Sequence, residues 1–514
     1  MARALDRKSR IVLLALVLFA VFFRLATLMM MNTGVDERDY WFSAKALSHG
    51  LPYPELSHRT TRFAVILPVA LAQLILGSHP NVYYVLPLLN SAAAAAIAFL
   101  IGSRLRGRLA GFLAGLGVTL FPYMARAGSQ VRPETFSITY ILLTLLFFLD
   151  YIDRKERELP PLIWTAVWLF IAYEAKITNL FFLPGLLLSV LLYKRKLSHA
   201  FLLGGILLAL FLIETGAYAA FTEYKFGELE IITRSHTLSG EPLVVGRFVD
   251  LFQRYSSSRL QFYWQAPFLL FAAAAAFYLA KRTSPAISAL AIAGLSFFLC
   301  ITFEVSSLKP IMPAEPFINR YFCSVLGPVF LVLGIAANDL LRRFGGRRLP
   351  DAILASPRVL VAILSLGAIG TLATFSFPRL PEGMRSYANS PLRLGSHPLA
   401  LNELYQRRID EALAKGIPIV AAQGIAGGNA LSTCEAFFVG IGRYEGGRPP
   451  SYAVRRIGNG DFLVLGGADE KADTYLAAMR APFRVAFIGR DALGALSADF
   501  LGGAEASKAD ADDQ

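Results

Sequence analysis

Charged residues are scarce in this chain of 514 residues. They make up 17% of it, whereas 55% of the residues are hydrophobic. Soluble proteins carry about 25% charged residues on average, and long apolar runs recur here from residue 11 to about residue 377. The scarcity of charge and the length of these runs exclude an ordinary soluble enzyme. They indicate a polytopic α-helical membrane protein.

Cysteines are also few. Three are too few for a disulfide framework, and Cys300, Cys323 and Cys434 show no metal-ligand spacing, so we interpret them as structural residues. A Gly-rich phosphate loop is missing from the apolar part, and "GIGRYEGG" (440–447) departs from the dinucleotide pattern G-x-G-x-x-G by one residue. The sequence therefore identifies no cofactor. A divalent metal is the one cofactor that we consider.

Acidic residues are outnumbered, since the formal net charge is +13. The basic residues form short clusters between apolar segments, which is typical of cytoplasmic loops, and so we expect no nucleic acid partner. The chain begins with the basic stretch "MARALDRKSR", and the apolar run that follows has no small-residue cleavage site. This pattern predicts an uncleaved signal anchor.

Charge parity predicts eleven membrane crossings. The apolar segment 62–77 is short and interrupted by Pro68. If it does not cross, the basic clusters fall on the cytoplasmic side together with the N-terminus, as the positive-inside rule requires. We therefore place 62–77 on the outer face as a juxtamembrane or re-entrant piece. The predicted crossings are 11–31, 82–102, 109–125, 136–152, 160–175, 177–193, 199–221, 263–280, 284–303, 320–340 and 357–377.

This topology places the first loop, 32–61, and the long loop, 222–262, on the outer side. Outside too are the loops 126–135 and 304–320 and everything after the last crossing. From about residue 385, strand-length apolar runs at 417–422, 436–441, 461–466 and 483–489 alternate with helical patterns at 401–416 and 470–481. We predict a transmembrane domain (1–377), a small periplasmic α/β domain (385–502) and a disordered acidic tail (503–514).

Two carboxylates follow the first crossing directly, in "TGVDERDYW" (33–41). Asp36 and Glu37 are costly to hold charged at a membrane edge. Such a pair suits a general base or a metal site, although solvated loop acids remain an equal alternative. Glu134 in "SQVRPETF" is predicted on the same outer face. Pro133 suits the first turn of a helix, so helix capping explains Glu134 fully as well.

Basic residues are predicted on the same outer face, and several cations around two acids suit a ligand that carries a phosphate. Arginine at a membrane edge also extends to lipid headgroups, so that alternative stays open. Lys176 lies in the very short turn "YEAKITN", where Glu174 is a possible structural partner. The basic set is Arg62, Arg126, Arg132, Lys176 and Arg320.

These motifs together resemble the GT-C superfamily of membrane-embedded glycosyltransferases. The similar branch contains the protein O-mannosyltransferases and the bacterial lipid A aminoarabinose transferases. "VDERDY" (35–40) resembles their D-E-x-x-Y motif, with Asp36, Glu37 and Tyr40 in register. The likeness continues through "RFAVILPVALAQLILG", "SRLRGRLAGFLAGLGVTLFPYMARAGSQVRPETF", "AKITNLFFLPG" and the R-Y pair Arg320–Tyr321. It covers about residues 10–340.

The resemblance implies a GT-C-like fold in the bacterial inner membrane. It implies transfer of a sugar from a polyprenyl-phosphate carrier to an acceptor hydroxyl of a lipid, glycan or protein on the periplasmic face, with inversion. Asp36 would take the acceptor proton, with Glu37 and Glu134 as the other catalytic residues. These three acids would hold a metal, if one binds. The substrate-binding residues would be Tyr40, Arg62, Arg126, Arg132, Lys176, Arg320 and Tyr321. Membrane lipid would be a further partner of the protein.

The chain departs from the family at two places. Glu134 stands where many bacterial members have aspartate, and the Glu-Lys-Pro-Pro of the aminoarabinose transferases is absent, with Arg62 in place of its lysine. The sugar is therefore not assigned. Three other classes remain open, of which a non-catalytic receptor with the C-terminal domain as sensor is the weakest. A lipid-sugar flippase is disfavoured because the charges gather at the outer edge rather than at mid-membrane. An O-antigen polymerase or ligase is disfavoured because the loop 222–262 is not strongly basic.

Overall fold

The structure is a computed structural model. Its contacts divide the chain into two compact units, which we describe separately. The first comprises Met1–Thr27, Thr61–Val65 and Pro87–Ala388, and the second Leu28–Thr60, Ile66–Leu86 and Asn389–Gln514. The residues described are 6–28, 36–50, 53, 56–77, 79–156, 158–225, 227–228, 230–231, 259–281, 284–303, 305–308, 311–313, 319–346, 348–376, 399, 419–422, 452–457, 461–466 and 485–488.

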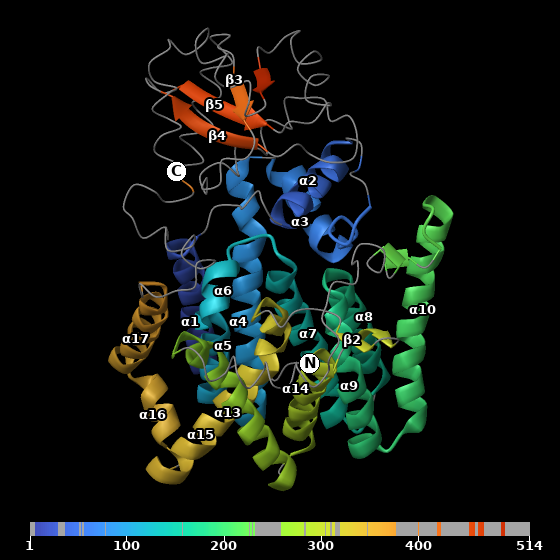
Figure 1. The fold of residues 1–514 in the computed structure, drawn as a ribbon. Helices are drawn as coiled ribbons and strands as arrows, with labels where there is room; N and C mark the ends of the chain where they lie inside the picture. Colours follow the sequence, from blue (N-terminus) through green and yellow to red (C-terminus); the bar gives the residue numbers. More distant parts are fainter. Residues whose placement is uncertain are drawn as a thin grey trace. The chain divides into compact units, whose positions relative to one another are not determined.

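The first unit is a bundle of helices (Figure 1). A short antiparallel hairpin of β1 (Val305–Leu308) and β2 (Ile311–Pro313) joins two of them. The helices are α1 (Arg7–Ala26), α4 (Val85–Arg106), α5 (Arg108–Leu120), α6 (Pro122–Ala127), α7 (Pro133–Asp153), α8 (Leu159–Ala175), η2 (Ile177–Phe182), α9 (Leu183–Ser189), η3 (Val190–Lys194), α10 (Leu197–Phe221), α13 (Arg259–Lys281), α14 (Pro285–Phe303), η4 (Asn319–Val325), α15 (Leu326–Gly345), α16 (Leu349–Ala355) and α17 (Pro357–Ser376).

Six helices among the described residues are long and apolar enough to cross a membrane, and the bent pair α16–α17 is a seventh candidate. The prediction of a multi-pass helical membrane protein is therefore confirmed. Ten of the predicted crossings correspond to helical segments of the structure within a few residues at most boundaries. The crossing predicted at 109–125 is wrong in extent. α5 ends at Leu120 and α6 begins at Pro122, because a proline ring cannot continue the hydrogen bonding of the preceding helix.

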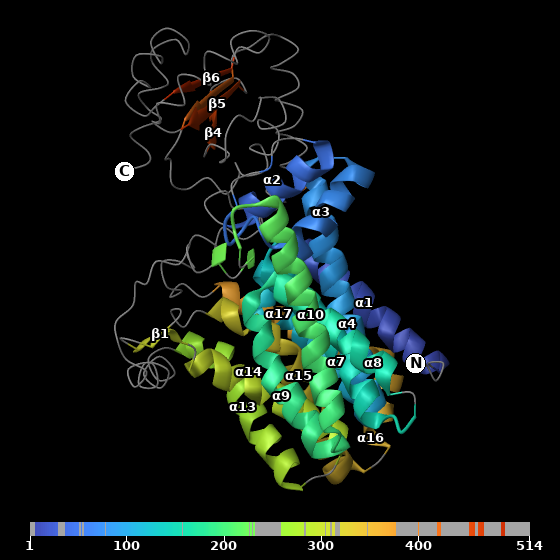
Figure 2. The same cartoon turned by 90° about the vertical axis from the view of Figure 1, so that its right-hand side faces the viewer.

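The core of this unit lies between α7, α8, α14 and α15. α7 packs along α8 and also contacts α14, while α15 packs against α5. α10 contacts α8 and lies toward the viewer in Figure 2. Large apolar side chains along it are exposed. A helix with apolar residues on its exposed side fits a lipid environment rather than water. The exposed side chains of α10 include Phe201, Leu208, Leu212 and Ile213.

Two glycines allow α4 and α5 to approach closely. A Cβ atom added to Gly111 would lie 2.2 Å from the carbonyl oxygen of Phe99 and 2.3 Å from Oγ of Ser103. Gly102 faces Gly111, since a Cβ on Gly102 would lie 2.7 Å from the Cα of Gly111. Small residues at such crossings are a common way to pack helices in membranes, because they bring the backbones into contact.

We expect Gly111→Ala to destabilise the protein by about 1–3 kcal/mol, because the extra methyl group forces α4 and α5 apart. The measurement is thermal unfolding of the detergent-purified protein. Gly205→Ala in α10 is the matched control, because a Cβ at Gly205 meets nothing within 4 Å. Equal melting temperatures for the two variants would contradict the close helix crossing.

The second unit contains α2 (Asp36–His49), most of α3 (Phe63–Leu76) and η1 (Pro80–Tyr84). The predicted outer loop 32–61 thus contains a helix of 14 residues, which starts at Asp36. Acidic residues in the first turn favour this start because they complement the helix dipole. Trp41 of α2 packs edge-on against Tyr83, with ring centroids 5.6 Å apart. Gln73 of α3 donates its amide to the carbonyl oxygen of Trp41 at 3.3 Å.

The C-terminal region contains a four-stranded sheet in the order β4-β5-β3-β6. β3 runs parallel to β5 and β6, whereas β4 pairs with β5 in antiparallel fashion. Three strands fall where the sequence predicts them, and β4 was not predicted. The predicted strand 436–441 and helices 401–416 and 470–481 lie outside the described residues. The strands are β3 (Ile419–Ala422), β4 (Tyr452–Ile457), β5 (Asp461–Gly466) and β6 (Val485–Ile488).

Candidate active site

The first unit brings two predicted site residues together in a buried ion pair. Nζ of Lys176 lies 3.0 Å from Oε1 of Glu134. Both residues are almost fully buried, with 3% and 4% of their surface exposed. Burial lowers the pKa of Lys176, and the carboxylate of Glu134 opposes that shift. The ammonium group carries three donors, and Oε1 of Glu134 accepts one of them.

Local sequence explains why these two side chains sit at helix ends. Pro133 occupies the first turn of α7, where its missing N–H costs nothing, and Glu134 follows in the same turn. Lys176 adopts an extended backbone between the end of α8 and the start of η2. The pair joins residues 42 positions apart. It therefore ties α7 to the break after α8.

Aromatic and basic groups surround the pair. Nζ of Lys176 lies 4.5 Å from the ring centroid of Tyr321, a favourable distance for a cation over an aromatic face. Nη1 of Arg132 donates to the hydroxyl of Tyr123 at 3.4 Å. Burial raises the pKa of Tyr123, and the nearby charge of Glu134 raises it further. Glu134, Arg132, Lys176 and Tyr321 thus form one neighbourhood.

Arg62 belongs to the same unit. It is half-buried and directly precedes α3. Burial lowers the pKa of Lys176 and raises the pKa of Glu228; the charge of Arg62 adds to the shift of Lys176 and opposes that of Glu228. Arg62, Lys176 and Arg132 all belong to the basic set named from the sequence, and their role in binding a phosphate stays a prediction.

Asp36, Glu37 and Tyr40 lie on α2 in the second unit. Glu37 and Tyr40 are fully buried. Glu37, Trp41 and Lys45 recur every four residues, so they share one face of the helix, and all three are buried. Burial lowers the pKa of Lys45 to about 8. The side chains of Asp36, Arg126 and Arg320 lie outside the described part of the chain.

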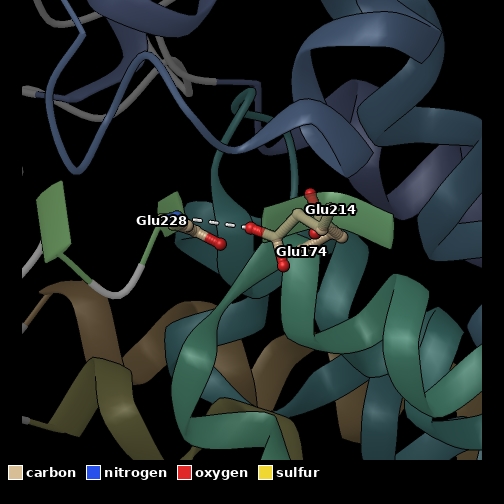
Figure 3. Close-up of side chains that lie close together, drawn as sticks. All are labelled: Glu174, Glu214 and Glu228. Carbon is tan, nitrogen blue, oxygen red and sulfur yellow. Dashed lines mark hydrogen bonds between the residues drawn. The ribbon is translucent and has the colours of Figure 1, made fainter. Parts of the chain in front are cut away.

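The predicted alternative partner of Lys176 is not the one in the structure. Glu174 pairs with neither Lys176 nor another described cation. It lies with Glu214 and Glu228 instead, and one carboxylate oxygen of each is within 4.8 Å of the others (Figure 3). Sequence analysis missed Glu214 and Glu228. Glu214 had a usable signal, because an acid inside the apolar run 199–221 is a functional candidate by default.

Comparisons with known proteins support the family resemblance over part of the chain. The sequence pattern of the family described as Dolichyl-phosphate-mannose-protein mannosyltransferase matches residues 63–218. A search of curated proteins finds no match.

Solved structures of two kinds are similar. ArnT from Cupriavidus metallidurans bound to undecaprenyl phosphate has 13% identity and a TM-score of 0.48, covering 95% of this chain and 90% of that chain. Its apo state has 14% identity and a TM-score of 0.45, covering 84% and 75%. The Archaeoglobus fulgidus oligosaccharyltransferase in the apo form has 13% identity and a TM-score of 0.47, covering 75% and 60%. Residues 63–218, which include Glu134 and Lys176, carry the sequence pattern of the dolichyl-phosphate-mannose-protein mannosyltransferases, as the motifs predicted.

Proposed function

We propose that the protein is an inverting glycosyltransferase that moves a sugar from a polyprenyl-phosphate carrier to an acceptor hydroxyl. The observation that carries this proposal is the buried Lys176–Glu134 pair beside Tyr321 and Arg132, within the region that matches the mannosyltransferase family. A buried ammonium near further basic side chains suits the phosphate that must leave.

In this mechanism Asp36 removes the proton of the acceptor hydroxyl as its oxygen attacks the anomeric carbon. The bond from that carbon to the carrier phosphate breaks in the same displacement, so the configuration inverts. Lys176, Arg62 and Arg132 stabilise the negative charge that develops on the departing phosphate. Glu134 orients Lys176 and balances its charge between turnovers. Because Lys176 already occupies Glu134, no step in this mechanism uses a metal on that carboxylate.

The direct test is transfer by the detergent-purified protein from a polyprenyl-phosphate-linked sugar to an acceptor extract. Formation of a glycosylated acceptor with inverted anomeric configuration supports the proposal. Movement of the lipid-linked sugar across proteoliposomes without any new glycosidic bond would favour the flippase instead. Mass spectrometry of the lipid A, glycan and glycoprotein pools of a deletion strain would identify the acceptor.

The proposed site lies on the periplasmic face of the bacterial inner membrane. α3 has 14 residues, about 21 Å of helix at ~1.5 Å per residue, against a hydrocarbon core of about 30 Å. Leu67, Leu71, Leu74 and Ile75 are exposed along one side of it, an apolar surface that suits contact with lipid. With α3 outside, eleven crossings would need the six long helices, the bent pair and the other four shorter apolar helices of the described residues each to count as one crossing.

The topology predicts that the domain after residue 385 is periplasmic. We expect a cysteine placed at Gly467, in a Cys434→Ser background, to react with an impermeant thiol reagent in intact spheroplasts. The reason is that eleven crossings from a cytoplasmic N-terminus end outside. A cysteine at Arg195, in the predicted cytoplasmic turn between two crossings, is the control and should react only after lysis. Labelling of Gly467→Cys only after lysis would contradict the proposed topology.

A further inference from the structure

Three glutamates gather where α8 and α10 end. Glu174 is in the last turn of α8, Glu214 is two turns before the end of α10, and Glu228 follows α10 by seven residues. Figure 3 shows their carboxyl groups converging. Glu228 is 1% exposed, and the other two are half-buried. Among the described residues, this is the one group of three or more potential metal ligands.

The chain is shaped to bring Glu228 back to α10. Gly227 has a φ of +64°, in the left-handed region that suits glycine. A Cβ there would lie 3.4 Å from Oε1 of Glu214. This turn lets the backbone N–H of Glu228 donate to the same oxygen at 3.3 Å. The third carboxylate is thus held in place by backbone geometry.

Two carboxylate oxygens of the group are buried without a hydrogen-bond partner in the part of the chain that the structure describes. They are Oε2 of Glu228 and Oε1 of Glu174. A buried ionised carboxylate is costly unless it is paired or coordinates a metal. Two like-charged neighbours add to the cost for Glu228. The charge of Arg62 acts on Glu228, but one cation does not balance three carboxylates. Protons or a bound cation must therefore complete the group.

We propose that Glu174, Glu214 and Glu228 bind one divalent cation, with Ca²⁺ as the best fit. All ligands are carboxylate oxygens, which hard cations prefer, and the group has no histidine or cysteine to favour zinc or copper. The three ligand oxygens lie within 4.8 Å of one another, close enough for one ion to gather them. Ca²⁺ accepts six to eight oxygens at about 2.3–2.6 Å in flexible geometry, whereas Mg²⁺ demands near-ideal octahedral geometry at about 2.0–2.1 Å, so an irregular carboxylate group favours Ca²⁺.

Such an ion would clamp the ends of α8 and α10 to the segment that follows α10. The site differs from the metal site predicted from the sequence, which would use Asp36, Glu37 and Glu134. It also stands apart from the proposed transferase activity, because its ligands are none of the proposed catalytic residues. The charge of Arg62 acts both on Glu228 of the glutamate group and on Lys176 of the candidate active site.

The test uses full-length protein in detergent, stripped with EDTA and dialysed against excess Ca²⁺. We expect elemental analysis to find one Ca²⁺ per chain and thermal unfolding to shift upward with Ca²⁺ in a saturable way. Glu228→Gln should bind Ca²⁺ at least about tenfold more weakly, because it loses a charged ligand. Glu223→Gln is the matched control, since Glu223 is an exposed acid of the same segment, and it should bind Ca²⁺ like the wild type.

If Glu228→Gln does not fold, Glu214→Gln serves as the second variant, and the metal content of the wild type decides the question by itself. The proposal is overturned if the wild type holds no ion and Ca²⁺ leaves its unfolding unchanged. In that case the carboxyl groups share protons instead, consistent with the hydrogen bond between Glu174 and Glu214. Preferential binding of Zn²⁺ over Ca²⁺ would overturn it too. None of these outcomes depends on a transferase assay.

Discussion

Asp36→Asn should lower turnover by a factor of about 10²–10⁴, the usual cost of removing a general base. Asparagine keeps the shape of the side chain and its ability to hydrogen-bond, but it cannot take a proton from the acceptor. The fold should survive. The measurement is transfer from a polyprenyl-phosphate-linked sugar by purified protein whose unfolding temperature matches the wild type.

Asp39→Asn is the control for this experiment. Asp39 lies three residues further along the same helix and pairs with Arg59 at 3.0 Å, a partly exposed ion pair worth at most about 1 kcal/mol. Its loss should leave turnover nearly unchanged. Near wild-type turnover in Asp36→Asn would remove the base from Asp36 and move the search first to Glu134. Glu37→Gln should also lower turnover, because this carboxylate is expected to position the acceptor.

Lys176→Met should destabilise the protein by about 3–5 kcal/mol, because it leaves Glu134 charged and buried without its partner. The double variant Lys176→Met/Glu134→Gln removes both charges and should regain most of that stability, since replacing a whole buried pair is often nearly neutral. Chemical unfolding in detergent measures both. Each variant leaves the surrounding apolar packing in place, so the comparison isolates the charge.

Donor binding separates the two roles of Lys176. A charge-assisted contact to the carrier phosphate is worth about 1.5–3 kcal/mol. The stable double variant should therefore bind polyprenyl phosphate about ten to a hundred times more weakly than the wild type. If it binds the carrier as tightly as the wild type, Lys176 has only a structural role, and the phosphate site must be sought among the other basic residues.

Helix positions were predictable from the sequence because hydrophobic length is a local property. The segments 136–152, 160–175 and 199–221 lie within α7, α8 and α10, with ends that differ by no more than three residues. The failure at 109–125 is instructive, since Pro122 gives a local signal against one continuous helix there. The helix beginning at Asp36 was missed because α2 is polar overall, and its formation depends on burying Trp41 and Tyr40.

The sequence predicted only part of the candidate site. The types of residue and their predicted side of the membrane came from motifs and charge parity, and Glu134 with Lys176 did prove to be neighbours. The sequence did not predict which acid pairs with Lys176. Glu174, two residues from Lys176, was the obvious counter-ion in the sequence, yet the structure pairs Lys176 with Glu134, 42 residues away.

By itself, the sequence determined that this is a multi-pass membrane protein and where most of its helices lie. It also determined which polar residues interrupt the apolar pattern. These follow from the cost of placing backbone and charges in hydrocarbon, which each segment meets separately. Only the tertiary structure decided that Glu134 is the ion-pair partner of Lys176 and that Glu174 lies with Glu214 and Glu228. That choice depends on how α7, α8 and α10 pack, because a buried charge takes whichever partner the packing brings within hydrogen-bonding distance.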